Sequence, residues 1–246
     1  MGEAIAVVSG KGGTGKTSVC AGVAIAMAAA GLRVLCIDCD VGLRNLDIPL
    51  GLSDSCTLSF LDVLEGGYTL GQASRHPAWP TLSFLTAPVD RTVDQIDTKA
   101  FAGMVFQARK LFDYVFLDAP AGVEDGFRLV SSVADRFLLV TGPGPAAVRD
   151  AARVGELLEL MGKTDVRMIV NRVDRAMLSL LRFTIDDVMD QAGLPLLGIV
   201  LEDTDVALAA ACGKPLLQCS KRSPAAVAYR KISRRIQGLP EPITLR

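Results

Sequence analysis

The stretch Gly10-Lys11-Gly12-Gly13-Thr14-Gly15-Lys16-Thr17 lies between an apolar run, Ala4–Ser9, and an alanine-rich run with helical spacing. It satisfies the pattern GxxxxGK[ST], in which glycines let backbone N–H groups converge on phosphate oxygens. A helix that begins near Lys16 would present free amides and the positive end of its dipole to an anion. The stretch therefore predicts a phosphate-binding loop between a first strand and a first helix.

Short β-branched runs alternate with helical patterns along the rest of the chain. Most of the runs are continuously apolar, which is typical of parallel strands covered on both faces. We therefore predict an α/β fold with a doubly wound, mostly parallel sheet of about seven strands and helices on both faces. The predicted strands are Ala4–Ser9, Arg33–Asp38, Leu82–Ala87, Tyr114–Asp118, Arg136–Thr141, Val166–Asn171 and Leu196–Leu201. The predicted helices are Lys16–Ala30, Thr98–Phe112, Ala146–Met161, Thr184–Ala192 and Ala225–Ile236.

The composition indicates a single globular domain. Of the 246 residues, 50% are hydrophobic and 22% are charged, which excludes intrinsic disorder. The longest uncharged apolar run, Val19–Leu32, is shorter than the ~20 residues that a spanning helix requires, so we expect a cytoplasmic protein. We expect one nucleotide-binding domain over residues 1–246, with a core over 1–237 and a short tail over 238–246. Six scattered cysteines argue against a disulfide framework, and Cys36 and Cys39 are expected to be packed thiols.

Charge is distributed unevenly along the chain. The formal net charge is −1, but Ala207–Arg246 carries eight Lys or Arg residues against one acid, so this segment is +7 and the remainder −8. Such asymmetry indicates either an anionic partner, membrane or nucleic acid, or a final helix with a solvated basic face. The helix reading is slightly favoured, because the apolar residues of Ala225–Ile236 form one stripe with the basic residues off it.

Aspartates follow two of the predicted strands. Asp118 ends the strand Tyr114–Asp118, and Asp38 and Asp40 lie at the end of another strand. Ligand crevices of open α/β sheets lie outside the carboxyl ends of the strands, so these carboxylates should face the phosphate loop. Lys16 would then reach the β- and γ-phosphates, while Thr17 and a strand-end aspartate would hold Mg²⁺. Any one of the three could instead be an ordinary turn residue.

Lys11 makes the loop KGGTGKT, which resembles the deviant Walker A motif of the MinD/ParA family. The resemblance implies a P-loop NTPase fold of the SIMIBI type, and a dimer that sandwiches two ATP molecules. In that dimer Lys11 would reach the nucleotide phosphates of the partner subunit. The segment Asp38–Asp47 resembles the switch I of the septum-site branch of this family, and Asp118–Gly122 resembles its switch II. By that likeness Asp40 would orient the attacking water and Asp118 would hold Mg²⁺ through water.

These inferences predict a slow, Mg²⁺-dependent ATPase with a role in the spatial regulation of cell division. The expected nucleotide-binding residues are Gly10, Lys11, Gly12, Gly13, Thr14, Gly15, Lys16, Thr17, Ser18, Asn171 and Arg172. The expected catalytic residues are Lys11, Lys16 and Asp40, and the expected Mg²⁺ ligands are Thr17, Asp40 and Asp118, partly through water. We expect ATP-dependent homodimers and a protein regulator or activator, with His76 incidental to the chemistry.

Three alternatives stay open. The basic C-terminal segment could serve a ParA-type partitioning ATPase on DNA, although the switch I sequence makes DNA the less favoured partner. A flagellar-number regulator shares much of the switch I frame. The motif Asn171-Arg172-Val173-Asp174 resembles an adenine contact, yet it is one substitution from the guanine-reading NKxD; ATP is favoured over GTP. Membrane attachment at the cytoplasmic face is also undecided, because the usual family targeting helix is missing and Pro240 and Pro242 forbid a continuous one.

Overall fold

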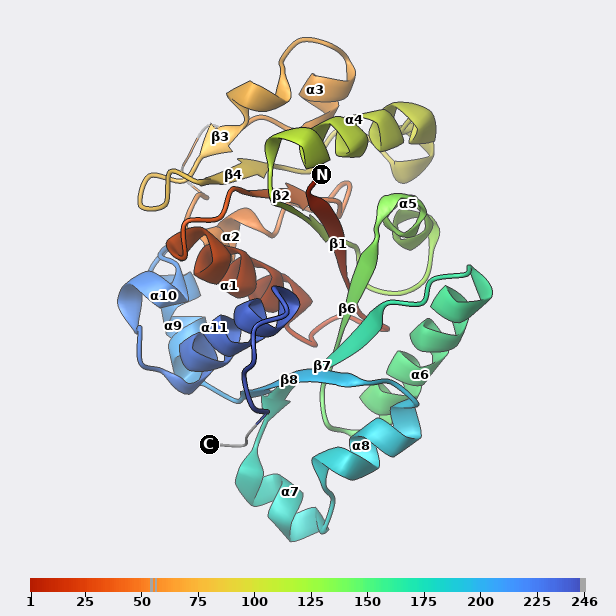
Figure 1. Cartoon of the computed structure of the whole chain (residues 1–246), viewed down its shortest axis with the longest axis vertical. Coiled ribbons are helices and arrows are strands. Elements are labelled where there is room, and N and C mark those ends of the chain that lie inside the picture. Colours follow the sequence, from red (N-terminus) through yellow and green to blue (C-terminus); the bar gives the residue numbers. More distant parts are fainter. Residues whose placement is uncertain (54, 56, 244–246) are drawn as a thin grey trace.

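The computed structural model describes residues 1–53, 55 and 57–243, which form an α/β fold around one twisted sheet (Figure 1). The sheet has eight strands in the order β3-β4-β2-β5-β1-β6-β7-β8, all parallel to their neighbours except β3, which runs antiparallel to β4. The strands are β1 (Glu3–Val8), β2 (Val34–Asp38), β3 (Ser74–Arg75), β4 (Leu82–Leu85), β5 (Tyr114–Asp118), β6 (Arg136–Thr141), β7 (Val166–Val173) and β8 (Leu196–Leu201).

Helices connect the strands and cover both faces of the sheet (Figure 1). The longer ones are α1 (Lys16–Ala29), α4 (Thr98–Leu111), α5 (Asp125–Val133), α6 (Pro145–Leu160), α7 (Arg175–Leu181), α8 (Ile185–Ala192), α9 (Thr204–Ala211) and α11 (Pro224–Ile236). Shorter ones are α2 (Asp47–Leu50), α3 (Phe60–Leu64) and α10 (Leu216–Cys219), with 3-10 turns η1 (Leu70–Gln72) and η2 (Val93–Gln95).

The predicted fold class is confirmed, and all seven predicted strands and five predicted helices are present with ends within two residues of the predicted ones. The eighth strand, β3, was not predicted because two residues carry no alternation that a pattern could detect. The helices α5, α7 and α9 were also not predicted.

The apolar core lies in two layers, one on each face of the sheet. One layer contains α1 and α11, and the other contains α4, α5 and α6. Alternate strand residues feed the two layers, so Ile5 and Val7 face α1 while Ala4 and Ala6 face the other side. Cys36 and Cys39 are fully buried on opposite faces, which confirms packed thiols at these positions.

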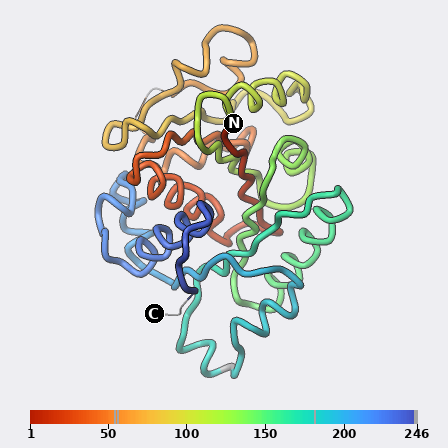
Figure 2. The backbone as a smooth tube through the Cα atoms, viewed as in Figure 1, coloured from red at the N-terminus to blue at the C-terminus, as the bar shows by residue number. Residues whose placement is uncertain are grey.

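Helix α11 sits in close contact with both α1 and the edge strand β8, although it lies near the end of the chain (Figure 2). A Cβ atom added at Gly22 on α1 would overlap the ring of Tyr229. A Cβ atom added at Gly198 on β8 would overlap the side chain of Ile232. The two glycines therefore form the seats on which α11 docks.

Arginines of α11 hold the segment that follows it. Arg234 forms an ion pair with Glu241 at 2.9 Å. Arg235 donates hydrogen bonds to the carbonyl groups of Glu241, Pro242 and Leu197, the last of which belongs to the edge strand β8. Described residues beyond Gly238 are not helical, as the two prolines predict, and residues 244–246 of the predicted tail lie outside the described part. Among the described residues, no helix combines the length and apolar character needed to cross a membrane.

His76, which we expect to be incidental to the chemistry, is a buried side chain. Its Nε2 lies 2.9 Å from the carbonyl oxygen of Leu50, and its Nδ1 accepts the N–H of Ala78 at 3.1 Å. The ring also packs on Trp79. These bonds require the neutral tautomer with hydrogen on Nε2, because Nδ1 must accept. Burial lowers the pKa of His76, against a smaller opposing effect of the hydrogen bond to Leu50.

We expect Gly22→Ala to destabilise the fold by about 1–3 kcal/mol, because the new methyl group would displace the Tyr229 ring from its seat. Gly103→Ala, in the middle of α4, is the matched control: a Cβ there meets nothing within 4 Å. That substitution should be neutral or stabilise by up to about 1 kcal/mol. Urea unfolding of the two variants measures both effects, and equal free energies of unfolding would contradict the docking account.

The pKa of His76, the only histidine in the sequence, should lie below its unfolded value of about 6.5. As the pH falls through that value, the unfolded chain takes up a proton before the folded chain does. The contribution of His76 therefore lowers stability progressively below about pH 6.5 and has no effect above it. NMR titration of the imidazole signal measures the midpoint, and a midpoint at or above 6.5 would show that the buried bonds do not hold the ring neutral.

Candidate nucleotide-binding site

The glycine-rich loop connects β1 to α1 at the carboxyl edge of the sheet. Gly13 and Gly15 have φ angles of 80° and 81°, in the left-handed region that glycine adopts without strain. Gly15 is the N-cap of α1, and no described side chain caps that helix, so its first amides are free for an anion. A Cβ at Gly12 or Gly13 would meet nothing within 4 Å, which leaves open space in front of the loop.

Lys16 and Asp118 form a buried ion pair beneath the loop. The Nζ of Lys16 lies 2.6 Å from Oδ1 of Asp118, and the two side chains are 8% and 1% exposed. Nζ also donates to the hydroxyl of Thr17 at 3.3 Å. Burial lowers the pKa of Lys16, but the adjacent Asp118 carboxylate outweighs this effect and the pKa is raised, so the lysine stays charged.

Asp38 organises the segment that follows β2. It lies opposite Asp118 in the parallel pairing of β2 with β5. Its carboxylate accepts backbone N–H groups from Asp40, Asn45 and Leu46, each at 3.0 Å. Burial, followed by the negative charge of Asp118, raises the pKa of Asp38 to about 6, although the three N–H groups oppose this.

Asp40 lies at the same edge as the loop and remains partly exposed. The pKa of Asp40 is raised, mainly because burial disfavours its charged form. The positive charge of Lys16 opposes this rise, and the negative charge of Asp118 adds to it. The predicted convergence of Lys16, Thr17, Asp40 and Asp118 at one edge is therefore what the structure shows.

Lys11 lies outside the cradle formed by its own loop. Its Nζ is 3.7 Å from Oδ2 of Asp150 on α6, and both side chains are more than 40% exposed. The same aspartate limits the loop sterically, because a Cβ at Gly10 would come within 2.7 Å of its Cβ. Of the three predicted catalytic residues, Lys11 is therefore the one that lies away from the Lys16–Asp118 ion pair.

A pocket of about 300 Å³ adjoins the loop and α1. Its apolar wall comes from the end of β8 and from α9, namely Val200, Leu201, Val206, Ala207 and Ala210. Its polar lining includes Asn171, whose Nδ2 donates to the carbonyl of Thr14 at 2.8 Å. A pocket with an apolar wall and several polar groups suits the base of a nucleotide, and we call it the base pocket.

Arg172 links the base pocket to the phosphate loop. Its Nη1 donates to the carbonyl of Gly13 at 3.3 Å, and its Nε lies 2.9 Å from Oε2 of Glu202. The residue has a φ of 58°, which is uncommon for a side chain of this size. That conformation at the end of β7 lets the guanidinium turn back toward the loop.

Asp174, the last residue of the ambiguous NRVD motif, does not line the base pocket. Its carboxylate caps α7 by accepting the backbone N–H groups of Ala176 and Met177. A guanine-reading aspartate has to offer its carboxylate to the base, and this carboxylate is already engaged by a helix end.

Sequence reasoning assigned no role at the site to Asp150, Glu202 or Tyr229, all of which the structure places there. Glu202 directly follows β8, much as Asp118 ends β5. The expectation that polar residues at the carboxyl ends of strands face the ligand could therefore have found it. Asp150 forms its ion pair with Lys11, which lies 139 positions earlier, and a local sequence pattern cannot predict a contact between such distant residues. Tyr229 belongs to the apolar stripe of α11, which hides a hydroxyl that reaches the pocket.

The residues at the loop fit a nucleotide with its magnesium ion. The hydroxyl of Thr14 is buried without a hydrogen-bond partner among the described residues, as expected of a group that binds a phosphate oxygen. Within that part of the chain, no cluster of three or more His, Cys, Asp or Glu side chains could hold a metal ion by itself.

Comparison with known proteins identifies the family. The sequence model of the CobQ/CobB/MinD/ParA nucleotide binding domain matches residues 5–216. A septum site-determining protein MinD from Synechocystis sp. is 37% identical over 244 residues, covering 98% of this chain and 92% of the relative.

Solved structures agree. A MinC:MinD cell division protein complex from Aquifex aeolicus matches with a TM-score of 0.90 and 34% identity, covering 98% of both chains. The septum site-determining protein MinD from Pyrococcus horikoshii, complexed with Mg-ADP, matches with a TM-score of 0.84 and 28% identity over 96% of both chains. With its phosphate loop and base pocket in place, the chain belongs to the MinD branch of the CobQ/CobB/MinD/ParA family of nucleotide-binding proteins.

Proposed function

We propose that the chain is a MinD-like ATPase, a nucleotide-switched dimer that hydrolyses ATP in the spatial regulation of cell division. The observation that carries the proposal is the position of Lys11. A complete phosphate loop surrounds Lys16, while Lys11 projects from the same loop as a half-exposed side chain that is weakly tied to Asp150. A cation so placed is available to the phosphates of a second subunit. The likeness to septum site-determining relatives over nearly the full chain supports the same role.

In the proposed site, the loop glycines and the first amides of α1 bind the phosphates, and Lys16 neutralises their charge. Thr17 and Asp118 would hold Mg²⁺, Asp118 through water, and Asp40 would orient the attacking water. Bound Mg²⁺ would supply charge neutralisation at the β- and γ-phosphate oxygens. Because Lys16 is paired with Asp118 at 2.6 Å, nucleotide binding requires this lysine to exchange a carboxylate partner for a phosphate partner.

We propose that turnover is slow. Phosphoryl transfer depends mainly on positioning and charge neutralisation, and Asp40, which is partly exposed, is the residue proposed to orient the water. Lys11 would complete the charge neutralisation when a second subunit presents it. Dimerisation and a protein regulator are therefore proposed to order the switches and accelerate hydrolysis.

ATP is the proposed substrate rather than GTP. Asn171 and Arg172 line the base pocket, while Asp174, which would read guanine, caps α7 instead. Competition between ATP and GTP for the wild-type protein is the direct comparison.

The structure offers little support for the DNA-partitioning alternative. The basic face of α11 that could contact phosphates is largely engaged within the chain: Arg234 pairs with Glu241, and Arg235 and Arg230 donate to backbone carbonyl groups. We propose instead a protein partner acting in the cytoplasm, as the neighbour solved as a MinC:MinD complex suggests.

Asp40→Asn should reduce ATP turnover by about 100-fold or more, because the neutral amide is a weaker hydrogen-bond acceptor than the carboxylate and cannot take a proton from the attacking water. ATP affinity should change little. Asp113→Asn, at the opposite end of β5, is the matched control and should leave turnover unchanged. Phosphate release and calorimetric titration with ATP measure the two quantities, and full turnover in Asp40→Asn would refute the role of Asp40.

Lys11→Ala should abolish ATP-dependent dimerisation while preserving the folded monomer. The reason is that Lys11 contributes only an exposed ion pair to its own subunit, worth little to stability. Lys99→Ala, at an exposed position on α4, is the control. Size-exclusion chromatography with light scattering, with ATP and with ADP, measures the mass; a dimer of Lys11→Ala in ATP, or a wild-type protein that stays monomeric, would contradict the proposal.

A further inference from the structure

The base pocket contains a polar group that the proposed catalysis does not use. Tyr229, on α11, lines both the base pocket and a smaller cavity of about 30 Å³ behind it. The residue is 2% exposed. Within the described residues, its hydroxyl makes no hydrogen bond, and its oxygen is not among the fully buried unpartnered atoms, so the hydroxyl opens onto the pockets that the residue lines. This combination marks the Tyr229 hydroxyl as a group that awaits a ligand.

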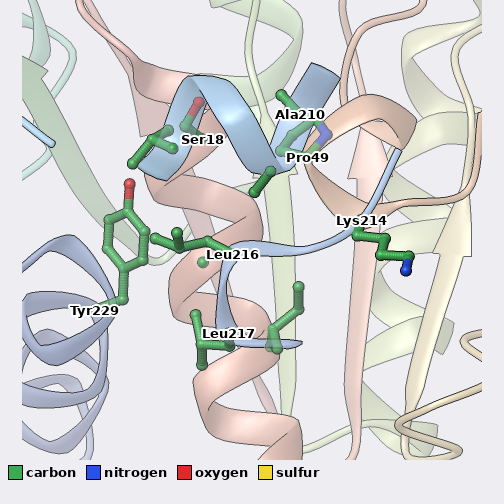
Figure 3. A pocket seen from close by; sticks show the side chains of 11 residues that line it. Ser18, Pro49, Ala210, Lys214, Leu216, Leu217 and Tyr229 are labelled. Carbon is green, nitrogen blue, oxygen red and sulfur yellow. The ribbon is translucent and has the colours of Figure 1, made fainter. Parts of the chain in front are cut away.

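The ring of Tyr229 is held in one position. It lies against Gly22 on α1, at a distance that any Cβ on that glycine would block. Figure 3 shows the ring extending from α11, with the hydroxyl oxygen directed toward the end of the small cavity where Ser18 lies. Ser18 directly follows the phosphate loop and lines both spaces. The hydroxyl is therefore fixed at the junction of the base pocket and the start of α1.

Apart from Ser18, the polar side chains that line the base pocket with Tyr229 are already engaged. The amide of Asn171 donates to a backbone carbonyl, Arg172 pairs with Glu202, and the carboxylate of Asp203 accepts backbone N–H groups at the starts of α9 and α11. Burial, together with the negative charge of Asp203, raises the pKa of Tyr229, so the phenol stays neutral. A neutral phenol can both donate and accept a hydrogen bond.

A purine in this pocket would bring ring nitrogens and substituents into a largely apolar slot. Such groups lose their bonds to water and need partners in the protein. We propose that Tyr229 is a binding residue for the purine base, and that its hydroxyl hydrogen-bonds to the polar edge of the ring. The proposal rests on the proposed function, because it places the nucleotide base in the base pocket. It makes α11, a helix distant in sequence from the phosphate loop, a wall of the nucleotide site.

Tyr229→Phe removes one oxygen atom and keeps the ring on Gly22. The expected result is a Kd for Mg·ATP that rises about threefold to tenfold, the usual effect of one lost hydrogen bond between neutral groups. The Kd for magnesium tripolyphosphate, which has no base, should not change. Isothermal titration calorimetry measures both. Tyr114→Phe, at the start of β5, removes a hydroxyl far from the site and should alter neither value.

A second measurement uses the wild-type protein, so it does not depend on how the variant folds. With ring-labelled tyrosine, one of the three tyrosine NMR signals should shift on addition of Mg·ATP and not on addition of tripolyphosphate. Unchanged ATP affinity in Tyr229→Phe, or an equal loss of affinity for ATP and tripolyphosphate, would overturn the assignment of Tyr229 while leaving the proposed ATPase intact. Wild-type protein that binds neither compound would overturn the proposed function as well.

Discussion

The buried ion pair between Lys16 and Asp118 is the constraint around which the site is arranged. Two opposite charges withdrawn from water are tolerable only together, because removal of either leaves an uncompensated charge in the interior. The pair joins the first turn of α1 to the end of β5, across 102 positions of sequence. Asp38, opposite Asp118 on β2, then gathers three backbone N–H groups of the following segment. Phosphate loop and switch segment are thus built on one charged centre.

The rest of the fold keeps that centre in place. Parallel strands buried on both faces bring their carboxyl ends to one edge, where the loops can carry polar groups without disturbing the core. Helix α1 begins at the phosphate loop and is covered by α11, whose approach depends on the absence of a side chain at Gly22. The packing of the last helix and the geometry of the first loop are therefore coupled through a single helix.

Local patterns in the sequence were sufficient to predict those parts of the site that are formed by neighbouring residues or by the end of a single strand. Gly10–Thr17 forms the loop that its spacing predicts, and the strand-end position of Asp118 correctly places it near Lys16. Contacts between distant segments were not predictable in this way. The ion pair of Lys11 with Asp150 and the reach of Tyr229 into the base pocket both depend on how helices pack after the sheet has formed. The two-residue strand β3 arises from its neighbour β4 rather than from any propensity of its own.

Arg235 holds the residues after α11 and also contacts the edge of the sheet. It donates to the carbonyl of Leu197 on β8, the last strand of the order. An open edge of this kind can pair with a strand from another molecule, which is a route to aggregation. The guanidinium occupies one of the acceptors that an incoming strand would need, and the segment around Pro242 lies over the same margin. The chain is proposed to dimerise through its nucleotide-binding face. Its contacts at β8 therefore disfavour a second mode of association, edge-to-edge strand pairing.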